Sequence, residues 1–309
     1  MKAIEIHSFG GPEVLQVEEV PIPDIRTDEV LVRVYATSVN PVDWKIREGH
    51  MGDRNLPFVP GWDLSGVVEE TGIDVKDFKK GDEVYTRPDV KRDGTYAEYI
   101  CVKASELARK PDSIDHVNAA AIPLAGLTAW QCLFTHGHLE SGQKVLIHGA
   151  SGGVGTFAVQ FAKWKGAYVM ATASEKNHAF LKELGADEVI DYHQPGYEDT
   201  ISSVNLVIDT IGGETQQHSL RYIMPGGTLV TTLKPENHAV FEEKGIRLTG
   251  MMTTTDTDDL AAIAKLVDEG KVKPVIAAVL PLEEAEKAQR INEEGHVRGK
   301  IVLKVTPHH

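Results

Sequence analysis

Cysteine is scarce in this chain: Cys101 and Cys132 are the only two among 309 residues. Two cysteines are too few for the disulfide framework that holds small secreted domains together. We expect two buried thiols in a reducing compartment, and an isolated disulfide between them is the alternative.

Long apolar runs and an excess of basic residues are also missing. No stretch of about 18 apolar residues exists, so the sequence predicts no membrane-spanning segment. Residues 1–6 have the pattern of a strand rather than of a signal-peptide core, and a cytoplasmic location is therefore expected. The net charge of −14 argues against a nucleic-acid or anionic-membrane partner.

The rest of the composition is ordinary. Hydrophobic residues make up 41% of the chain and charged residues 25%, which is typical of a globular protein. A length of 309 residues allows about two domains.

The strongest local pattern lies at residues 145–155, which read VLIHGASGGVG. A short apolar strand runs into a glycine-rich turn, and the apolar spacing after it is helical. Strand, glycine turn and helix begin a dinucleotide-binding βαβ unit, here with Ala150 at the first glycine position of the usual motif. Gly152 lets the backbone approach a pyrophosphate, Gly155 lets the helix pack close to the strand, and the helix start favours an anion. The predicted phosphate contacts are Ser151, Gly152, Gly153, Val154 and Gly155.

Five further strand patterns distinguish this segment from an isolated tight turn. Helix-like segments separate most of them, and alternating strands and helices predict a parallel, doubly wound sheet. The expected strands cover residues 167–172, 189–191, 206–209, 228–231 and 246–249. The fold class expected for the chain is therefore α/β.

The first part of the chain has a different pattern. Short apolar–polar runs punctuated by proline and glycine predict a β-rich, barrel-like domain. The last strand pattern, residues 300–305, does not extend the parallel sheet, so we expect it to return to the first domain. The predicted division is a β-rich domain over 1–122 with 265–309 returning to it, and a nucleotide domain over 123–264. No site is predicted at His308 and His309, where the sequence ends.

Six short motifs occur in the order in which a known family carries them. They are residues 38–43 (SVNPVD), 60–66 (PGWDLSG), 94–99 (GTYAEY), 126–130 (GLTAW), 149–155 (GASGGVG) and 295–300 (GHVRGK). Over essentially its whole length the chain resembles the medium-chain dehydrogenase/reductase superfamily, and these motifs resemble its zeta-crystallin-like, enone reductase-like quinone oxidoreductase branch. The resemblance implies a GroES-like domain, a Rossmann domain and an active site in the cleft between them.

The resemblance also bears on zinc. Zinc-dependent alcohol dehydrogenases of this superfamily have a cysteine ligand where this chain has Asn40, and a His–Glu pair where it has Trp62 and Asp63. The stretch 81–101, where their structural zinc lobe lies, holds only Cys101. A zinc site needs three or four ligands close together, and the histidines of this chain are scattered. We therefore expect no metal.

The end of the second Rossmann strand decides the expected cofactor. NAD-specific sites carry an acid there, but residues 172–174 are small and neutral. Ser174 and Lys176 offer a hydroxyl and a cation to a 2′-phosphate, and Tyr192 matches a tyrosine that contacts this phosphate in similar quinone reductases. NADPH is therefore expected in preference to NADH. The alternatives are an N-cap role for Ser174, a solvated Lys176 and a packed Tyr192 ring.

Further cofactor contacts follow from topology, because ligands bind at the carboxyl ends of parallel strands. Thr128 lies in a segment that is near the nicotinamide in the family, and an ordinary helical threonine is the alternative. Arg298 and Lys300 either reach the cleft or are surface charges. The residues expected at the strand ends are Thr210, Leu233, Met251 and Thr253.

Without a metal to polarise an alcohol oxygen, we expect hydride transfer from NADPH to an already activated acceptor. Quinones and α,β-unsaturated carbonyls qualify because charge delocalises onto their oxygen. Lys45, where the best-known quinone oxidoreductases have tyrosine, is expected to bond the substrate carbonyl or donate a proton, and Asn40 to hold the nicotinamide or a substrate oxygen. An exposed or ion-paired Lys45 and a turn role for Asn40 are the alternatives.

Two other functions stay open. One is a zinc-free carbonyl or alcohol dehydrogenase. The other belongs to a different class, an NADPH-binding sensor or structural protein without turnover. The family also implies a homodimer formed through the edge of the Rossmann sheet.

Overall fold

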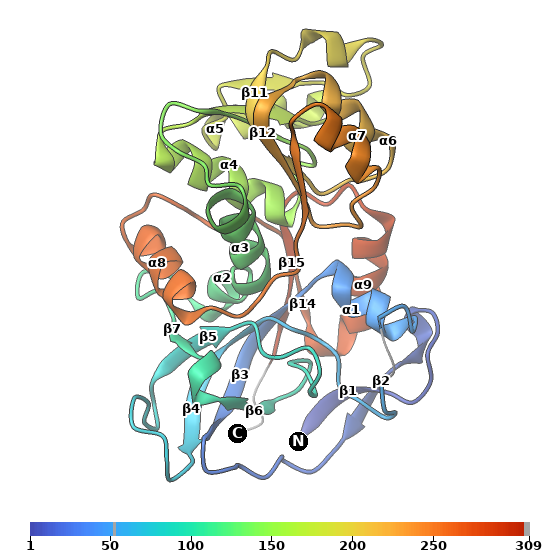
Figure 1. The fold of residues 1–309 in the computed structure, drawn as a ribbon. Coiled ribbons are helices and arrows are strands. Elements are labelled where there is room, and N and C mark those ends of the chain that lie inside the picture. The colour runs from blue at the N-terminus through green and yellow to red at the C-terminus, as the bar shows by residue number, and fades with distance from the viewer. Residues whose placement is uncertain (52–53, 306–309) are drawn as a thin grey trace. The chain divides into compact units, whose positions relative to one another are not determined.

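The computed structural model describes residues 1–51 and 54–305, and the chain forms two compact units. Unit 1 contains Met1–Leu124, Thr255–Gly270 and Pro274–His309, and unit 2 contains Ala125–Thr254 and Lys271–Lys273 (Figure 1). The sequence pattern puts the second domain boundary at residue 264, whereas the chain changes units after Thr254. His308 and His309 lie outside the described residues.

Unit 2 is built on a six-stranded sheet in which every neighbouring pair of strands is parallel. The spatial order is β10-β9-β8-β11-β12-β13, so the chain starts in the middle of the sheet and reverses direction once. This is the Rossmann arrangement, and the predicted doubly wound sheet is confirmed. The strands are β8 (Lys144–Ile147), β9 (Tyr168–Thr172), β10 (Glu188–Ile190), β11 (Val204–Asp209), β12 (Ile223–Thr231) and β13 (Arg247–Gly250).

Helices connect these strands, and α4 (Gly153–Lys165) follows the glycine-rich turn directly. Its apolar residues Phe157, Phe161 and Ala162 are fully buried, as the helical spacing predicts. Gly166, with a left-handed φ of 87°, ends the helix. The other helices of this part of the chain are α3 (Pro123–Trp130), α5 (His178–Glu183), α6 (Glu214–His218) and α7 (His238–Glu243).

Unit 1 is β-rich. Its main sheet has the order β14-β15-β3-β4-β5-β7, β6 also pairs with β3, and β1 and β2 form a separate antiparallel hairpin. β15 pairs antiparallel with β3, with Val302 opposite Ser38, so a late segment of the chain lies beside an early one. The strands are β1 (Lys2–Ile6), β2 (Leu15–Glu19), β3 (Glu29–Val39), β4 (Leu64–Thr71), β5 (Glu83–Thr86), β6 (Tyr99–Lys103), β7 (Ala108–Arg109), β14 (Ile276–Pro281) and β15 (Lys300–Lys304).

The sequence pattern predicts most of these strands but not β2, the two-residue β7 and β14. β2 buries only Leu15 fully, and β14 is an edge strand whose residues are at best half-buried and which ends at Pro281. Neither strand has the buried apolar face on which a strand prediction depends.

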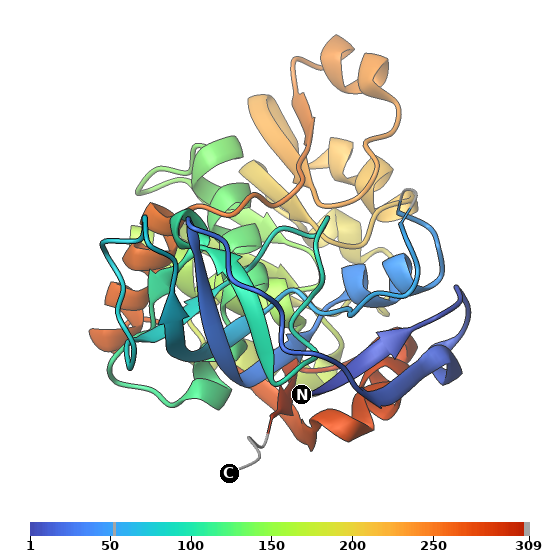
Figure 2. The same cartoon turned by 90° about the horizontal axis from the view of Figure 1, so that it is seen from below.

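In the described part of unit 1, the helices that accompany the sheet are α1 (Pro41–Arg47), α2 (His116–Ala120), α8 (Thr257–Asp268) and α9 (Ala285–Glu294). α9 packs against α1 and against the turn Pro12–Val14 that joins β1 to β2, as the view in Figure 2 shows. The hydroxyl of Tyr85 donates to the carbonyl of Leu260 at 2.6 Å, which ties α8 to β5. α8 also packs against β7, so both contacts join it to the sheet of unit 1.

Both cysteines are buried free thiols, as expected, so the alternative of a disulfide between them is excluded. Within residues 1–51 and 54–305, no helix combines the length and the apolar character that crossing a membrane requires.

Candidate active site

The glycine-rich turn of unit 2 has the geometry of a phosphate cradle. A Cβ on Gly155 would lie 2.4 Å from the carbonyl oxygen of Gly149, so only glycine lets α4 approach the turn this closely. A Cβ on Gly152 would meet only that same oxygen, at 3.4 Å, so the space in front of the helix is open. The first N–H groups of α4, which have no acceptor within the helix, and its positive end therefore face open space, which fits a pyrophosphate. Ala150, at the first glycine position of the motif, is fully buried.

His148, which directly precedes the glycine-rich turn, is held by several hydrogen bonds. Its ring is buried, with Nδ1 at 2.9 Å from the Thr172 hydroxyl and Nε2 at 3.2 Å from the hydroxyls of Ser219 and Tyr222. Its carbonyl accepts a hydrogen bond from the Thr210 hydroxyl at 3.0 Å. Burial lowers the pKa of His148 to about 4, so the ring is neutral near pH 7. The carboxyl ends of β8, β9 and β11 are thereby tied together.

The residues predicted for the 2′-phosphate lie at neighbouring strand ends. Ser174 and Lys176 follow β9, Tyr192 follows β10, and the Ala173 N–H donates to the Ile190 carbonyl at 3.0 Å. Lys176 is exposed and Tyr192 is 40% exposed. Ser174 holds the N-cap position of the short helix Glu175–Asn177, but its hydroxyl makes no capping bond.

Asp209 shapes the loop after β11. Its Oδ1 accepts from the N–H groups of Ile211 and Gly212, each at 2.9 Å, and its Oδ2 accepts from the Thr231 hydroxyl at 3.0 Å. The loop that carries Thr210 is therefore fixed to the end of β12. Asp209 is not among the site residues predicted from sequence, although it is an acid at the end of the apolar run LVID.

Leu233 and Met251 follow the carboxyl ends of β12 and β13, and both are held there by hydrogen bonds to Thr231. The N–H of Leu233 donates to the Thr231 hydroxyl at 3.1 Å, and the N–H of Met251 donates to the Thr231 carbonyl at 3.0 Å. The Leu233 side chain lies close to Gly212, where a Cβ would be only 2.7 Å away. The structure thus brings Thr210, Leu233 and Met251 to one edge.

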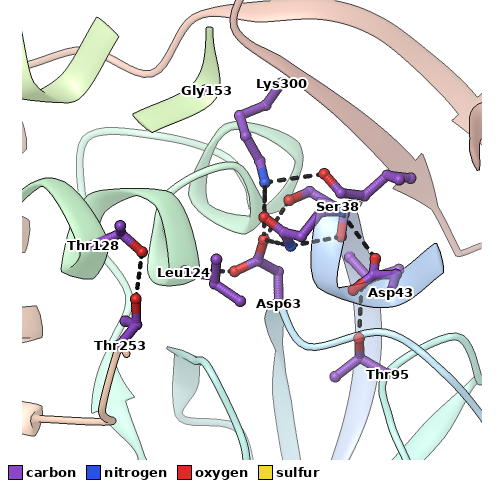
Figure 3. A network of polar contacts seen from close by, with 12 residues as sticks. Ser38, Asp43, Asp63, Thr95, Leu124, Thr128, Gly153, Thr253 and Lys300 are labelled. Atoms are coloured by element: carbon purple, nitrogen blue, oxygen red, sulfur yellow. Dashed lines mark hydrogen bonds and ion pairs between the residues drawn. The ribbon is translucent and has the colours of Figure 1, made fainter. Parts of the chain in front are cut away.

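The segment after β13 is fixed by two polar side chains of α3 and the turn that continues it. The hydroxyls of Thr128 and Thr253 lie 2.6 Å apart (Figure 3). The amide of Gln131 donates to the Thr254 carbonyl at 2.9 Å and accepts from the Thr254 N–H at 3.1 Å. Two predicted residues are therefore in contact, and Gln131 is a further one that spacing alone did not single out.

Unit 1 contains a buried polar cluster, which we call the Lys300 cluster: Ser38, Asn40, Asp63 and Lys300 (Figure 3). The Lys300 ammonium donates to the Val39 carbonyl at 3.1 Å, to Asp63 Oδ2 at 3.3 Å and to Asn40 Oδ1. The Ser38 hydroxyl donates to Asp63 Oδ2 at 2.5 Å. Lys300 is 4% exposed, so it is not a surface charge, whereas Arg298 is exposed.

The side chain of Asn40 is engaged within this cluster. Its Nδ2 donates to Asp63 Oδ2 at 2.7 Å and to the Ser38 carbonyl at 3.3 Å. Its Oδ1 accepts from Lys300. The other Asp63 oxygen accepts from the Leu124 N–H at 2.7 Å, which links the cluster to the start of α3.

Asp43 lies beside the cluster and anchors the start of α1. Its Oδ2 accepts from the Asn40 N–H at 2.9 Å and from the Tyr96 hydroxyl at 2.8 Å. Oδ1 has no hydrogen-bond partner among the described residues. Burial raises the pKa of Asp43 to about 7. Its hydrogen bonds account for a structural role.

Lys45 is on α1 but outside the cluster. It is half-buried, and its ammonium lies 5.5 Å from the centre of the Trp44 ring. Of the two acids that flank Lys45 in the sequence, Asp43 accepts a hydrogen bond from Tyr96, and Glu48 pairs with Arg47 at 3.2 Å. Among the described residues the Lys45 ammonium forms no ion pair, so it is available to a ligand.

Side-chain contacts with α9 hold α1 in place. The indole N–H of Trp44 donates to Asn292 at 3.1 Å, and the fully buried guanidinium of Arg47 contacts Gln289 at 3.0 Å and Glu293 at 2.7 Å. Trp62, which precedes Asp63 in the sequence, is completely buried and therefore belongs to the core.

Two family models match the chain. They are "Alcohol dehydrogenase GroES-like domain" over residues 26–112 and "Zinc-binding dehydrogenase" over residues 184–303. The mouse mitochondrial NAD(P)H oxidoreductase RTN4IP1 is 35% identical over 353 aligned residues, which cover 99% of this chain and 89% of that protein. The chloroplastic NADPH-dependent alkenal/one oxidoreductase of Arabidopsis thaliana is 35% identical over 320 residues, which cover 99% and 80%.

A solved structure agrees with these relatives. The quinone oxidoreductase from Coxiella burnetii superposes with a TM-score of 0.93 at 38% identity, over 99% of both chains. This chain belongs to the medium-chain dehydrogenase/reductase superfamily, in its quinone oxidoreductase branch.

Membership of this superfamily allows the Lys300 cluster to be compared with the zinc site of zinc-dependent members. Two of its members, Asn40 and Asp63, stand where zinc-dependent members of the superfamily have metal ligands. In this oxidoreductase chain both are bonded to the ammonium of Lys300. The sequence motif GHVRGK contains Lys300, but spacing did not reveal that its side chain turns inward.

Proposed function

We propose that this protein is an NADPH-dependent oxidoreductase that reduces quinones or α,β-unsaturated carbonyls by hydride transfer without zinc. The observation that carries the proposal is the Lys300 cluster. A protein ammonium bonds Asn40 and Asp63, so a positive charge is already present at the positions of the metal ligands. A dication beside the same carboxylate would have to displace or repel this ammonium.

The residues of unit 2 support the choice of cofactor. Ser151, Gly152, Gly153, Val154 and Gly155 would hold the pyrophosphate, because the turn is open at Gly152 and α4 is pressed against it at Gly155. Ser174, Lys176 and Tyr192 would bind the 2′-phosphate. The residues that would line the rest of the dinucleotide are Thr128, Thr210, Leu233, Met251 and Thr253. When bound, NADPH supplies the hydride.

Unit 1 would supply the polar contact to the acceptor. In the proposed mechanism Lys45 donates a hydrogen bond or a proton to the carbonyl oxygen that becomes negative. Asn40 acts through the cluster, because its amide is already hydrogen-bonded on both sides. A conjugated acceptor spreads the developing charge over its own π-system, so one or two donors suffice. A plain ketone or alcohol would need the stronger electrophile that a metal provides.

The relatives' names agree with this substrate class, since one is called an alkenal/one oxidoreductase and another a quinone oxidoreductase. The test is NADPH oxidation followed by absorbance, with ortho-quinones, para-quinones, enals, enones and saturated ketones as acceptors, before and after dialysis against a chelator. We expect turnover of conjugated acceptors that survives dialysis.

Other outcomes of this test would contradict the proposal. Loss of activity together with a stoichiometric zinc ion would refute the metal-free mechanism, and turnover of simple alcohols alone would favour a zinc-free alcohol dehydrogenase. Tight NADPH binding without turnover of any acceptor would favour the sensor or structural protein.

Assembly and location form the last part of the proposal. The sheet of unit 2 has two edge strands, β10 and β13, each with one side that no strand of the described residues covers, and such an open edge supports a homodimer through the sheet edge. Light scattering during size-exclusion chromatography tests the homodimer, and a monomeric mass would refute it.

The cytoplasmic location and the lack of nucleic-acid partners remain predictions from sequence and charge.

A further inference from the structure

Asn177 connects two parts of unit 2 that are distant in sequence. The residue is 6% exposed, and its Nδ2 lies 3.3 Å from the Ser151 hydroxyl and 3.2 Å from the Ser174 hydroxyl. Ser151 belongs to the glycine-rich turn before α4, and Ser174 follows β9. A single amide therefore bridges the place predicted for the pyrophosphate and the place predicted for the 2′-phosphate.

The chemistry of these two bonds fixes the direction of both hydroxyls. An amide NH₂ has two N–H donors and no acceptor, so each serine oxygen must be the acceptor in its bond to Asn177. Neither hydroxyl hydrogen is then used toward Asn177. Among the described residues neither serine hydroxyl donates to another group, and Ser174 does not cap its helix. Both O–H groups remain able to donate, which is what an anionic oxygen requires.

We propose that Asn177 is a positioning residue that orients the Ser151 and Ser174 hydroxyls as donors, and so contributes to the preference for a cofactor with a 2′-phosphate. This inference rests on the proposed function, because it takes NADPH as the ligand. Glu175 and Lys176 are exposed next to Ser174. A correctly directed hydroxyl at Ser174 therefore adds a hydrogen bond to the discrimination that the Lys176 cation supplies.

The first test measures binding rather than turnover. Calorimetry would give the Kd of NADPH, NADH and 2′,5′-ADP for the full chain and for Asn177→Asp. The carboxylate keeps the shape of the amide but only accepts hydrogen bonds, so both hydroxyls would turn their hydrogens toward residue 177. We expect NADPH and 2′,5′-ADP to bind about tenfold more weakly or worse, the fold-change of a lost bond to a charged group, with a smaller effect on NADH.

A double-mutant cycle separates this role from a merely structural one and from the added charge of aspartate. Asn177→Ala removes both donors without adding charge, and Ser174→Ala removes the hydroxyl through which Asn177 would act. We expect Asn177→Ala to lower the ratio of NADPH to NADH affinity about two- to fivefold in the native background and to leave that ratio unchanged in the Ser174→Ala background. Circular dichroism and thermal unfolding would verify that each variant is folded.

Two results would overturn the inference. One is an equal loss of NADPH and NADH affinity in the Asn177 variants, and the other is the same drop in preference with and without Ser174. Failure of the proposed function looks different, because the native protein would then bind NADH as tightly as NADPH, or bind neither. In that case the wild-type titrations alone reveal it.

Discussion

Lys300 Nζ lies 3.3 Å from Asp63 Oδ2, and both side chains are almost completely removed from water. Such a pair gains little net stability over an apolar pair, since desolvation offsets the attraction, but breaking it leaves one charge buried alone. The Lys300 cluster is therefore expected to tolerate the loss of both charges better than the loss of one.

The first prediction concerns this pair. Lys300→Met should lower the free energy of unfolding by about 3–5 kcal/mol because Asp63 would keep a buried charge without its cation. The double variant Lys300→Met with Asp63→Asn should be less destabilised than Lys300→Met alone. Urea unfolding measures both. Lys287→Met is the control, because its pair with Glu284 is exposed and worth at most about 1 kcal/mol. Equal destabilisation of single and double variants would contradict the charge argument.

The second prediction concerns Lys45. If its ammonium stabilises the developing oxyanion, Lys45→Ala should lower kcat about 10²–10³-fold and leave NADPH affinity unchanged. Lys265→Ala, on the exposed face of α8, is the matched control and should leave kcat within about twofold. A Lys45→Ala enzyme that also stays within twofold would remove Lys45 from the mechanism and leave positioning as the source of catalysis.

The third prediction concerns cofactor choice. Lys176→Glu replaces a cation near the expected 2′-phosphate with an anion, so kcat/KM for NADPH should fall while kcat/KM for NADH changes little. Steady-state kinetics with both cofactors measures the ratio. Lys244→Glu changes the net charge equally but lies at the end of α7, and it should leave the ratio as it is. If both variants shift the ratio alike, the effect is one of overall charge and not of a phosphate contact.

The fourth prediction concerns pH. The pKa of His148 falls from 6.5 to about 4 on folding, so between these values the unfolded chain binds the extra proton. The stabilisation is complete above pH 6.5 and decreases as the pH drops to 4, by about 3 kcal/mol in total. Asp43 acts in the opposite sense, since its raised pKa of about 7 makes the folded chain the better proton binder between pH 7 and 3.8.

The two contributions can be separated by variants. His148→Gln should flatten the loss of unfolding free energy between pH 6.5 and 4, whereas Asp43→Asn should steepen it. Chemical unfolding at several pH values gives both slopes. An unchanged slope in His148→Gln would mean that the ring titrates normally in the folded protein.

The parallel sheet of unit 2 could be predicted from sequence because each strand is a short apolar run followed by a polar residue. The contacts that complete the site were harder to predict. From sequence, Lys300 and Arg298 could each reach the cleft or be surface charges. The pairing of β15 with β3 brings the Lys300 side chain to Asn40 and Asp63. No sequence motif singles out Asn177, because its partner Ser151 is 26 positions away.

The route of the chain through unit 1 has a consequence for synthesis on the ribosome. All six strands of the unit 2 sheet are complete once residue 250 has emerged, so that sheet can form early. The sheet of unit 1 is still open at that moment, because β15 lies between β14 and β3 and all but β14 and β15 precede unit 2. Until β15 emerges, Asp63 has no ammonium beside it, and residues 36–39 of β3 lack the strand that pairs with them in the finished sheet. The half of the protein that is translated first is therefore the half that closes last.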